Sequence, residues 1–218
     1  MQPTLSSTTS LSAGMERYAE DSPPELLLII CTDPNLDSRL LDQFRREPLL
    51  VWRRTGPVVP PYEPDHREVE EAMDHAITKL GVKEIAICGH LPSEPLRALI
   101  SEDAPSEASQ RNSFLYYAQS TRQIVQEKYG QLQGDQLLQA VVEENVLVQM
   151  ANLRTYPSVL AGMASGKLRL HSWLYDADED ELYGHGFTQC LFLNRYQEFA
   201  QPEQGSLPYL DPCDIYLA

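Results

Sequence analysis

Three short runs rich in apolar residues constrain the fold of this chain more than any other feature of its sequence. The runs are Leu26–Cys31, Leu49–Trp52 and Glu84–Cys88, and each has the length of a strand buried on both faces. Over residues 69–80 apolar side chains recur at helical spacing, and Gly81 stands where a helix C-cap glycine belongs. Because strands that alternate with helices form right-handed crossovers, the pattern predicts an α/β fold with a central, mostly parallel sheet flanked by helices.

The length of 218 residues suits one well-buried core. Residues 1–24, rich in Ser and Thr, are expected to form a flexible polar arm, and residues 25–218 a single domain. Within that domain the pattern predicts two long amphipathic helices over 114–129 and 135–154, and a fourth core strand over 168–175.

The charge of the chain excludes several classes of partner. With 17 basic and 32 acidic residues the formal net charge is −15, so DNA, RNA and anionic membranes would be repelled. No apolar run approaches the roughly 20 residues that span a bilayer. The first residues lack the basic start and apolar stretch of a signal peptide, so we expect a cytoplasmic protein. The cysteines are far apart and are expected to be reduced thiols: Cys31, Cys88, Cys190 and Cys213.

Residues with metal-binding chemistry follow two of the predicted strands. Because ligands bind beyond the carboxyl ends of parallel strands, the segments Cys31–Asn35, Arg53–Pro57 and Gly89–Glu94 are expected to converge on one edge of the sheet. Cys31, Asp33 and His90 carry a thiol, a carboxylate and an imidazole, the three ordinary zinc ligand types. Taken singly, each is more often a structural residue, and only their convergence favours a metal site.

The remaining candidates favour structural roles. His66 and His75 lie on the polar side of a charged helix, where we expect them to be solvated, and His171 on the last core strand is expected to be structural. Arg53 and Arg54 could contact an anion, although pairing with the many acidic residues is the simpler expectation.

Four segments, in order and at matching spacing over roughly residues 25 to 180, resemble the β-class carbonic anhydrases. Cys31-Thr32-Asp33-Pro34-Asn35 resembles the family motif Cys-Ser-Asp-Ser-Arg. The run from Gly81 to Cys88-Gly89-His90 is similar to the family's Leu-Gly-Val-Lys, strand and Cys-Gly-His segment. The stretches 144–157 and 168–176 are similar to its late helix and final core strand.

The resemblance implies a set of site residues. In that family two cysteines and one histidine bind zinc, a water fills the fourth position, and an Asp paired with an Arg orients the nucleophile. Carried over by position, Cys31 matches the first cysteine, His90 the histidine and Asp33 the aspartate. Asn35 replaces the arginine, and Ser93 replaces the second cysteine.

These two departures leave two functions open. The first is a β-carbonic-anhydrase-like protein that has lost carbon dioxide hydration, binds no metal cofactor, and acts as a structural, binding or regulatory protein in bicarbonate handling. The second is a metalloenzyme with a rewired site. Without its arginine Asp33 is free to reach a metal, and Glu94 follows the vacant position, so zinc held with Cys31 and His90 would serve carbon dioxide hydration or hydrolysis of carbonyl sulfide or carbon disulfide.

Cys88 is not expected to replace the missing ligand, because we expect it to face away from His90. The resemblance also implies self-association as a homodimer or tetramer, with a further protein as a possible partner. Long amphipathic helices and sheet edges that one subunit would leave uncovered favour the same expectation.

Overall fold

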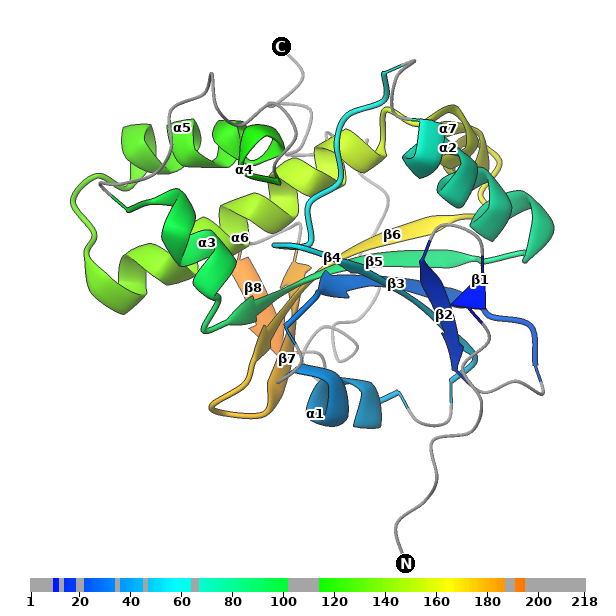
Figure 1. Ribbon diagram of the computed structural model, residues 1–218, viewed down its shortest axis with the longest axis horizontal. Coiled ribbons are helices and arrows are strands. Elements are labelled where there is room, and N and C mark those ends of the chain that lie inside the picture. Colours follow the sequence, from blue (N-terminus) through cyan, green and yellow to red (C-terminus); the bar gives the residue numbers. More distant parts are fainter. Residues whose placement is uncertain are drawn as a thin grey trace, which may run out of the picture.

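The architecture comes from a computed structural model, which describes residues 10–11, 14–18, 22–33, 36–44, 47–63, 67–101, 114–186 and 191–194. These residues form one eight-stranded sheet, in the order β1-β2-β4-β3-β5-β6-β7-β8 (Figure 1). Its four central strands are parallel: β3 (Leu26–Cys31), β4 (Leu49–Arg54), β5 (Glu84–Leu91) and β6 (Arg169–Asp176). The predicted fold class is confirmed.

Antiparallel strands extend the sheet at both edges. On the β4 side these are β2 (Met15–Tyr18) and β1 (Ser10–Leu11), and on the β6 side β7 (Glu181–Gly186) and β8 (Leu191–Asn194). The structure therefore differs from the flexible polar arm that the sequence predicts before residue 25. Met15 is fully buried in the core that β4 shares, which ties this segment to the domain.

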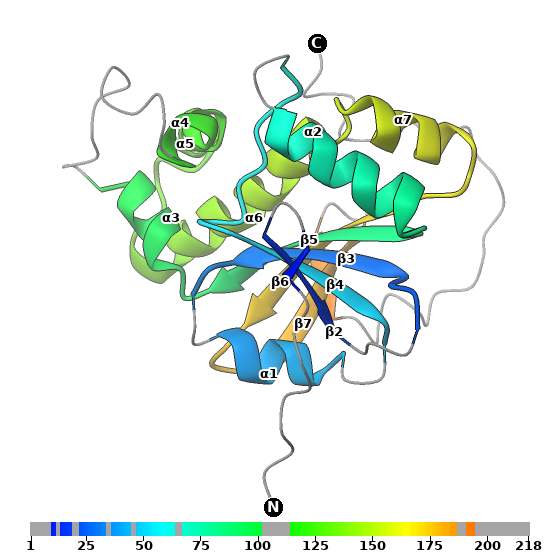
Figure 2. The same cartoon turned by 45° about the vertical axis from the view of Figure 1, so that its right-hand side comes forward.

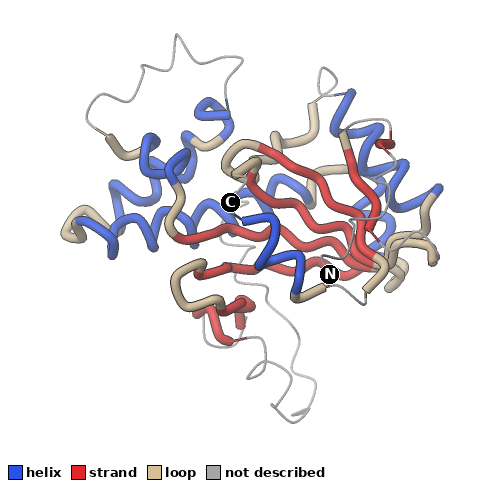
Figure 3. Tube along the Cα trace, turned by 60° about the horizontal axis from the view of Figure 1, so that its bottom comes forward, coloured by secondary structure: helices blue, strands red, loops and turns tan. Residues whose placement is uncertain are grey.

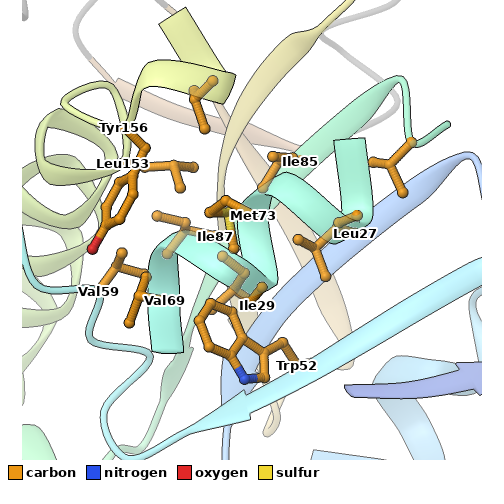
Figure 4. Packing of buried hydrophobic residues seen from close by; sticks show 14 of the residues in the cluster. Leu27, Ile29, Trp52, Val59, Val69, Met73, Ile85, Ile87, Leu153 and Tyr156 are labelled. Atoms are coloured by element: carbon orange, nitrogen blue, oxygen red, sulfur yellow. The ribbon is translucent and has the colours of Figure 1, made fainter. Parts of the chain in front are cut away.

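Helices cover the two faces of the sheet unequally. Of the described helices, α1 (Asp37–Asp42) packs on one face, where Figure 3 shows it crossing the strands. The opposite face carries α2 (Arg67–Asp74), the π-helix η2 (His75–Lys79), α6 (Gly134–Leu153) and α7 (Pro157–Ala164). Figure 4 shows the core on that side, where Leu27, Ile29 and Trp52 of the strands meet Val69 and Met73 of α2.

A third apolar cluster lies beyond the carboxyl ends of the strands. Here α3 (Glu94–Leu99), α4 (Phe114–Tyr117) and α5 (Gln119–Lys128) gather around α6, as Figure 1 shows on its left side. The helix predicted over residues 114–129 is thus divided into α4 and α5. The helix predicted over 69–80 continues through α2 but changes to π-helical geometry at His75.

The approach of α6 to the sheet depends on Gly89. A Cβ at this position would lie 2.7 Å from Val142 Cγ1 and 2.8 Å from Val146 Cγ2, well inside van der Waals contact. Glycine therefore allows α6 to pack directly on β5, next to His90. Both valines are fully buried, so neither can move toward solvent to make room.

We expect Gly89→Ala to destabilise the protein by about 1–3 kcal/mol, because an added methyl overpacks a closed core. Urea unfolding followed by circular dichroism measures the change. Val142→Ala removes one of the two clashing methyl groups, so the double variant should be more stable than the sum of the two single effects predicts. If the two single effects on stability add exactly, Gly89 does not determine the contact between α6 and β5.

Candidate functional site at the carboxyl ends of the central strands

The neighbouring strands β3 and β5 separate at their carboxyl ends. Pairing between β3 and β5 stops at Ile29 and Ile87, whereas β3 stays paired with β4 as far as Cys31, and β5 with β6 as far as Leu91. The chain leaves β3 toward β4 on one side and later returns to β5 on the other. This is the topological switch point of an open α/β sheet, where ligands bind. The candidate residues that were predicted from the sequence lie at these strand ends.

Cys31 and Asp33 come from the end of β3. The Cys31 thiol is free and fully buried in the apolar cluster between the sheet and α1. Asp33 is half-buried, and its carboxylate lies close enough to His90 to favour the charged form of that imidazole. Asn35 lies outside the described residues.

His90, near the end of β5, is only 2% exposed. Burial lowers the pKa of its imidazole, and the Asp33 carboxylate and a hydrogen bond to the Pro92 carbonyl oppose that shift in part. Nε2 is buried and has no hydrogen-bond partner among the described residues, so Nδ1 is the atom that donates to Pro92. His90 is therefore a neutral imidazole whose Nε2 lone pair is free to accept a proton or bind a metal.

Ser93 is the N-cap residue that precedes α3, and it is fully buried. Its side chain does not cap the helix, and within the described ranges its Oγ has no hydrogen-bond partner. Leaving a buried hydroxyl unpaired costs about 1–3 kcal/mol, so native proteins rarely do so without a water, ion or ligand nearby. Ser93 Oγ and His90 Nε2 are thus two unsatisfied polar atoms in one short segment.

The donors fit zinc only in part. Across the described ranges, no group of three or more His, Cys, Asp and Glu side chains is arranged to hold a metal ion. Glu94 is exposed, and its carboxylate pairs with Arg97 at 3.4 Å. Cys31 and His90 supply the ordinary donors, and Ser93 offers only a neutral hydroxyl. Among the described residues these donors do not form a complete zinc site.

The structure corrects the expected placement of Cys88. We predicted that it faces away from His90 because His90 would lie in a loop, but β5 continues to Leu91. Residues two apart on a strand share a face, so Cys88 and His90 lie on the same side of the sheet. Burial raises the pKa of the Cys88 thiol far above its usual value, so it is an apolar core residue at neutral pH.

Arg53 and Arg54 point to opposite faces of β4. Arg53 Nη2 donates to the Tyr18 hydroxyl at 3.0 Å, and its Nε lies 3.5 Å from the Glu16 carboxylate of β2. The simpler expectation, pairing with an acid, is thus met for Arg53 and also for Arg54, whose Nη1 lies 3.9 Å from the Glu68 carboxylate. Arg54 lies over the Trp52 ring at 4.8 Å and donates to the Val58 carbonyl, and burial lowers the pKa of its guanidinium.

The histidines outside the site differ in part from expectation. His171 is half-buried, lies 3.1 Å from the Glu84 carboxylate and stacks beside Trp173, which agrees with a structural role. His75 was expected to be solvated, but in the π-helix its Nε2 is buried without a hydrogen-bond partner among the described residues. His66 lies outside the described residues.

Polar side chains of α6 fix the loop that follows β4. Asn145 Nδ2 donates to the Gly56 carbonyl at 3.0 Å, Gln149 Oε1 accepts from the Val59 amide at 3.0 Å, and Asn152 Nδ2 donates to the Val59 carbonyl at 2.9 Å. Sequence reasoning missed these positioning residues. Their spacing of four and three residues in an otherwise apolar helix was the available signal, because a buried amide needs a partner.

Comparison with known proteins gives a consistent result. Residues 26–182 match the family model described as carbonic anhydrase. A carbonic anhydrase of Synechocystis is 30% identical over 92% of this chain and 71% of its own length, and one of Synechococcus elongatus is 31% identical over 77% and 62%. The solved structure of the β-carbonic anhydrase CcaA has a TM-score of 0.68 at 29% identity, covering 79% of this chain and 84% of that one.

We expect the untagged protein to carry well under one zinc ion per chain after dialysis, because Ser93 removes an anionic sulfur donor. Elemental analysis of the purified protein measures the stoichiometry. One zinc per chain that survives treatment with a chelator would contradict the expectation.

Proposed function

Because the chain belongs to the β-carbonic anhydrase family, we propose that it is a member that has lost carbon dioxide hydration and acts as a binding or regulatory protein in inorganic-carbon handling. The observation that supports this most is Ser93, a buried hydroxyl with no hydrogen-bond partner among the described residues, at the position where the family resemblance expects a zinc-binding cysteine.

Replacing the zinc-binding cysteine with serine weakens metal binding. A serine hydroxyl is neutral at pH 7, whereas a cysteine binds zinc as a thiolate. A complete structural zinc site contributes about 10–16 kcal/mol, so removal of one of three protein ligands costs several kcal/mol. Asn35, in place of the family arginine, cannot hold Asp33 through a charged bidentate contact. Both changes therefore act against carbon dioxide hydration.

A second candidate, an active metalloenzyme with a rewired site, is favoured by His90. Its Nδ1 donates to a backbone carbonyl and leaves Nε2 free, which is the arrangement that prepares a histidine to bind a metal. Zinc held at this site would supply a Lewis acid that makes a bound water more nucleophilic toward carbon dioxide or a related small molecule. In that candidate Cys31 and His90 bind the ion and Asp33 supplies a further oxygen donor or orients the nucleophile.

Other features of the proposal concern location and partners. We propose a cytoplasmic protein that associates with itself, and the net charge of −15 argues against a nucleic-acid partner. Among the described residues, no helix combines the length and hydropathy needed to cross a membrane.

Stopped-flow hydration of carbon dioxide should proceed near the uncatalysed rate, with and without added zinc, because two positions of the catalytic set are changed. The matched comparison is the double variant Asn35→Arg, Ser93→Cys, in which both family residues are restored and a measurable rate is expected. Ser93→Ala serves as the control, since it removes the hydroxyl without adding a ligand. A wild-type rate comparable to ordinary carbonic anhydrases would support the rewired enzyme instead.

A further inference from the structure

A cavity lies at the amino ends of β5 and β6, where two helices turn back into the sheet. The π-helix η2 leads through Gly81 into β5, and α7 leads through Gly166 into β6. Between these two turns is a space of about 500 Å³, lined by residues of both. Cys31 and His90 lie toward the opposite, carboxyl ends of their strands, so this cavity is separate from the candidate site.

The inner wall of the cavity is apolar. Ile77, Val82 and Leu168 line it, and the last two are buried in the core between the sheet and the helices. Gly162 of α7 adds no side chain, so the space between the turns stays open. An apolar wall with a few polar groups at its edge is the usual composition of a small-molecule site.

The charged residues around this cavity are all basic. Lys83, Lys167 and Arg169 line it, and none of the described residues that line it is acidic. In a chain with 17 basic and 32 acidic residues, three basic residues around one cavity reverse the charge of the protein as a whole. Local positive charge of this kind attracts anions.

Two of the three basic residues have partners that lie outside the cavity lining. Lys83 Nζ is 2.6 Å from the Glu25 carboxylate, and Arg169 pairs with Glu84. The Lys83 and Glu25 side chains are 63% and 58% exposed, so their pairing contributes little stability and another carboxylate can replace Glu25. The Lys167 ammonium has no partner among the described residues.

The carbonyl groups at the ends of η2 and α7 would oppose an anion, because helix carboxyl ends carry partial negative charge. The two turns satisfy these carbonyls within the chain. The Val82 amide donates to the Ala76 carbonyl at 3.0 Å. The amides of Lys167 and Leu168 donate to the Gly162 carbonyl at 3.0 and 3.1 Å. The lysine ammonium groups are therefore the main electrostatic influence on a ligand in the cavity.

A second cavity of about 470 Å³ shares Ile77 and Gly162 with the first and continues it along α7. Figure 2 shows α2 and α7 side by side along this path. Glu70 and Asp74 line this part, together with apolar atoms of Pro157. It has room for the uncharged part of a ligand, whereas a second negative charge would be repelled there.

We propose that the combined cavity binds a small organic carboxylate with one negative charge and an apolar body. The carboxylate lies between Lys83 and Lys167, where it takes the place that Glu25 holds opposite Lys83. The apolar body lies along Ile77 and extends beside α7 toward Glu70. The inference does not depend on the proposed function, because the cavity and the candidate site are at opposite ends of the strands.

Isothermal titration calorimetry of the full chain tests the ligand class with three molecules of equal length. Octanoate should bind at one site per chain. Octanol lacks the charge and octanedioate adds a second one, so each should bind at least about tenfold more weakly. Undetectable binding of octanoate, or equal affinity for octanol, would overturn the proposal.

Three single variants locate the carboxylate. Lys167→Ala, in an exposed turn, should weaken octanoate binding about tenfold, because it removes an ammonium group that contacts the ligand. Glu25→Gln should strengthen binding, since it frees Lys83 from its present partner. Arg122→Ala on α5 removes the same charge outside both cavities and should leave the affinity unchanged.

Thermal unfolding of each variant confirms that the comparison is made between folded proteins. Unchanged affinity in Lys167→Ala, or an equal loss in Arg122→Ala, would show that the cavity does not hold the carboxylate. Weaker binding by Glu25→Gln would contradict the exchange of partners at Lys83.

Discussion

The packing of α6 on β5 is the contact on which the rest of the structure depends. Gly89 allows the helix to lie against the strand, and Val142 and Val146 fill the space that a side chain would occupy. The same helix then extends beyond the carboxyl ends of the strands, where it becomes the centre of the third apolar cluster. Its position therefore links the sheet to the edge at which the candidate residues lie.

From that position α6 also orders the candidate site. Asn145, Gln149 and Asn152 bind the backbone of the loop after β4, so the helix helps to hold this loop in place. Strands β3 and β5 separate at their carboxyl ends, which leaves Cys31, His90 and Ser93 at the switch point of the sheet. The fold of the family is thus retained around these residues, and Ser93 places a hydroxyl where the family resemblance expects a thiolate.

Local patterns predicted the core of this fold well. The runs beginning at Leu26, Leu49 and Glu84 are buried strands, because strands covered on both faces must be apolar throughout. The pairing of Met15–Tyr18 with β4 was missed, since a short strand at a sheet edge carries mixed residues and is defined by its partner. The face of Cys88 was misjudged because the end of β5 depends on its pairing with β6, which no local pattern contains. The candidate ligands could be found from residue type and position. That Ser93 Oγ and His90 Nε2 find no hydrogen-bond partner in the described part of the chain depends on tertiary packing.

In the proposed function, Ser93 is the residue that prevents this site from binding zinc tightly. Competition with a chromophoric chelator measures the zinc affinity of the wild-type protein and of Ser93→Cys under identical conditions. If one missing thiolate costs several kcal/mol, the variant should bind zinc at least about 100-fold more tightly than the wild type. Equal affinities, or tight binding by the wild type, would show that Ser93 does not limit the site and would contradict the account.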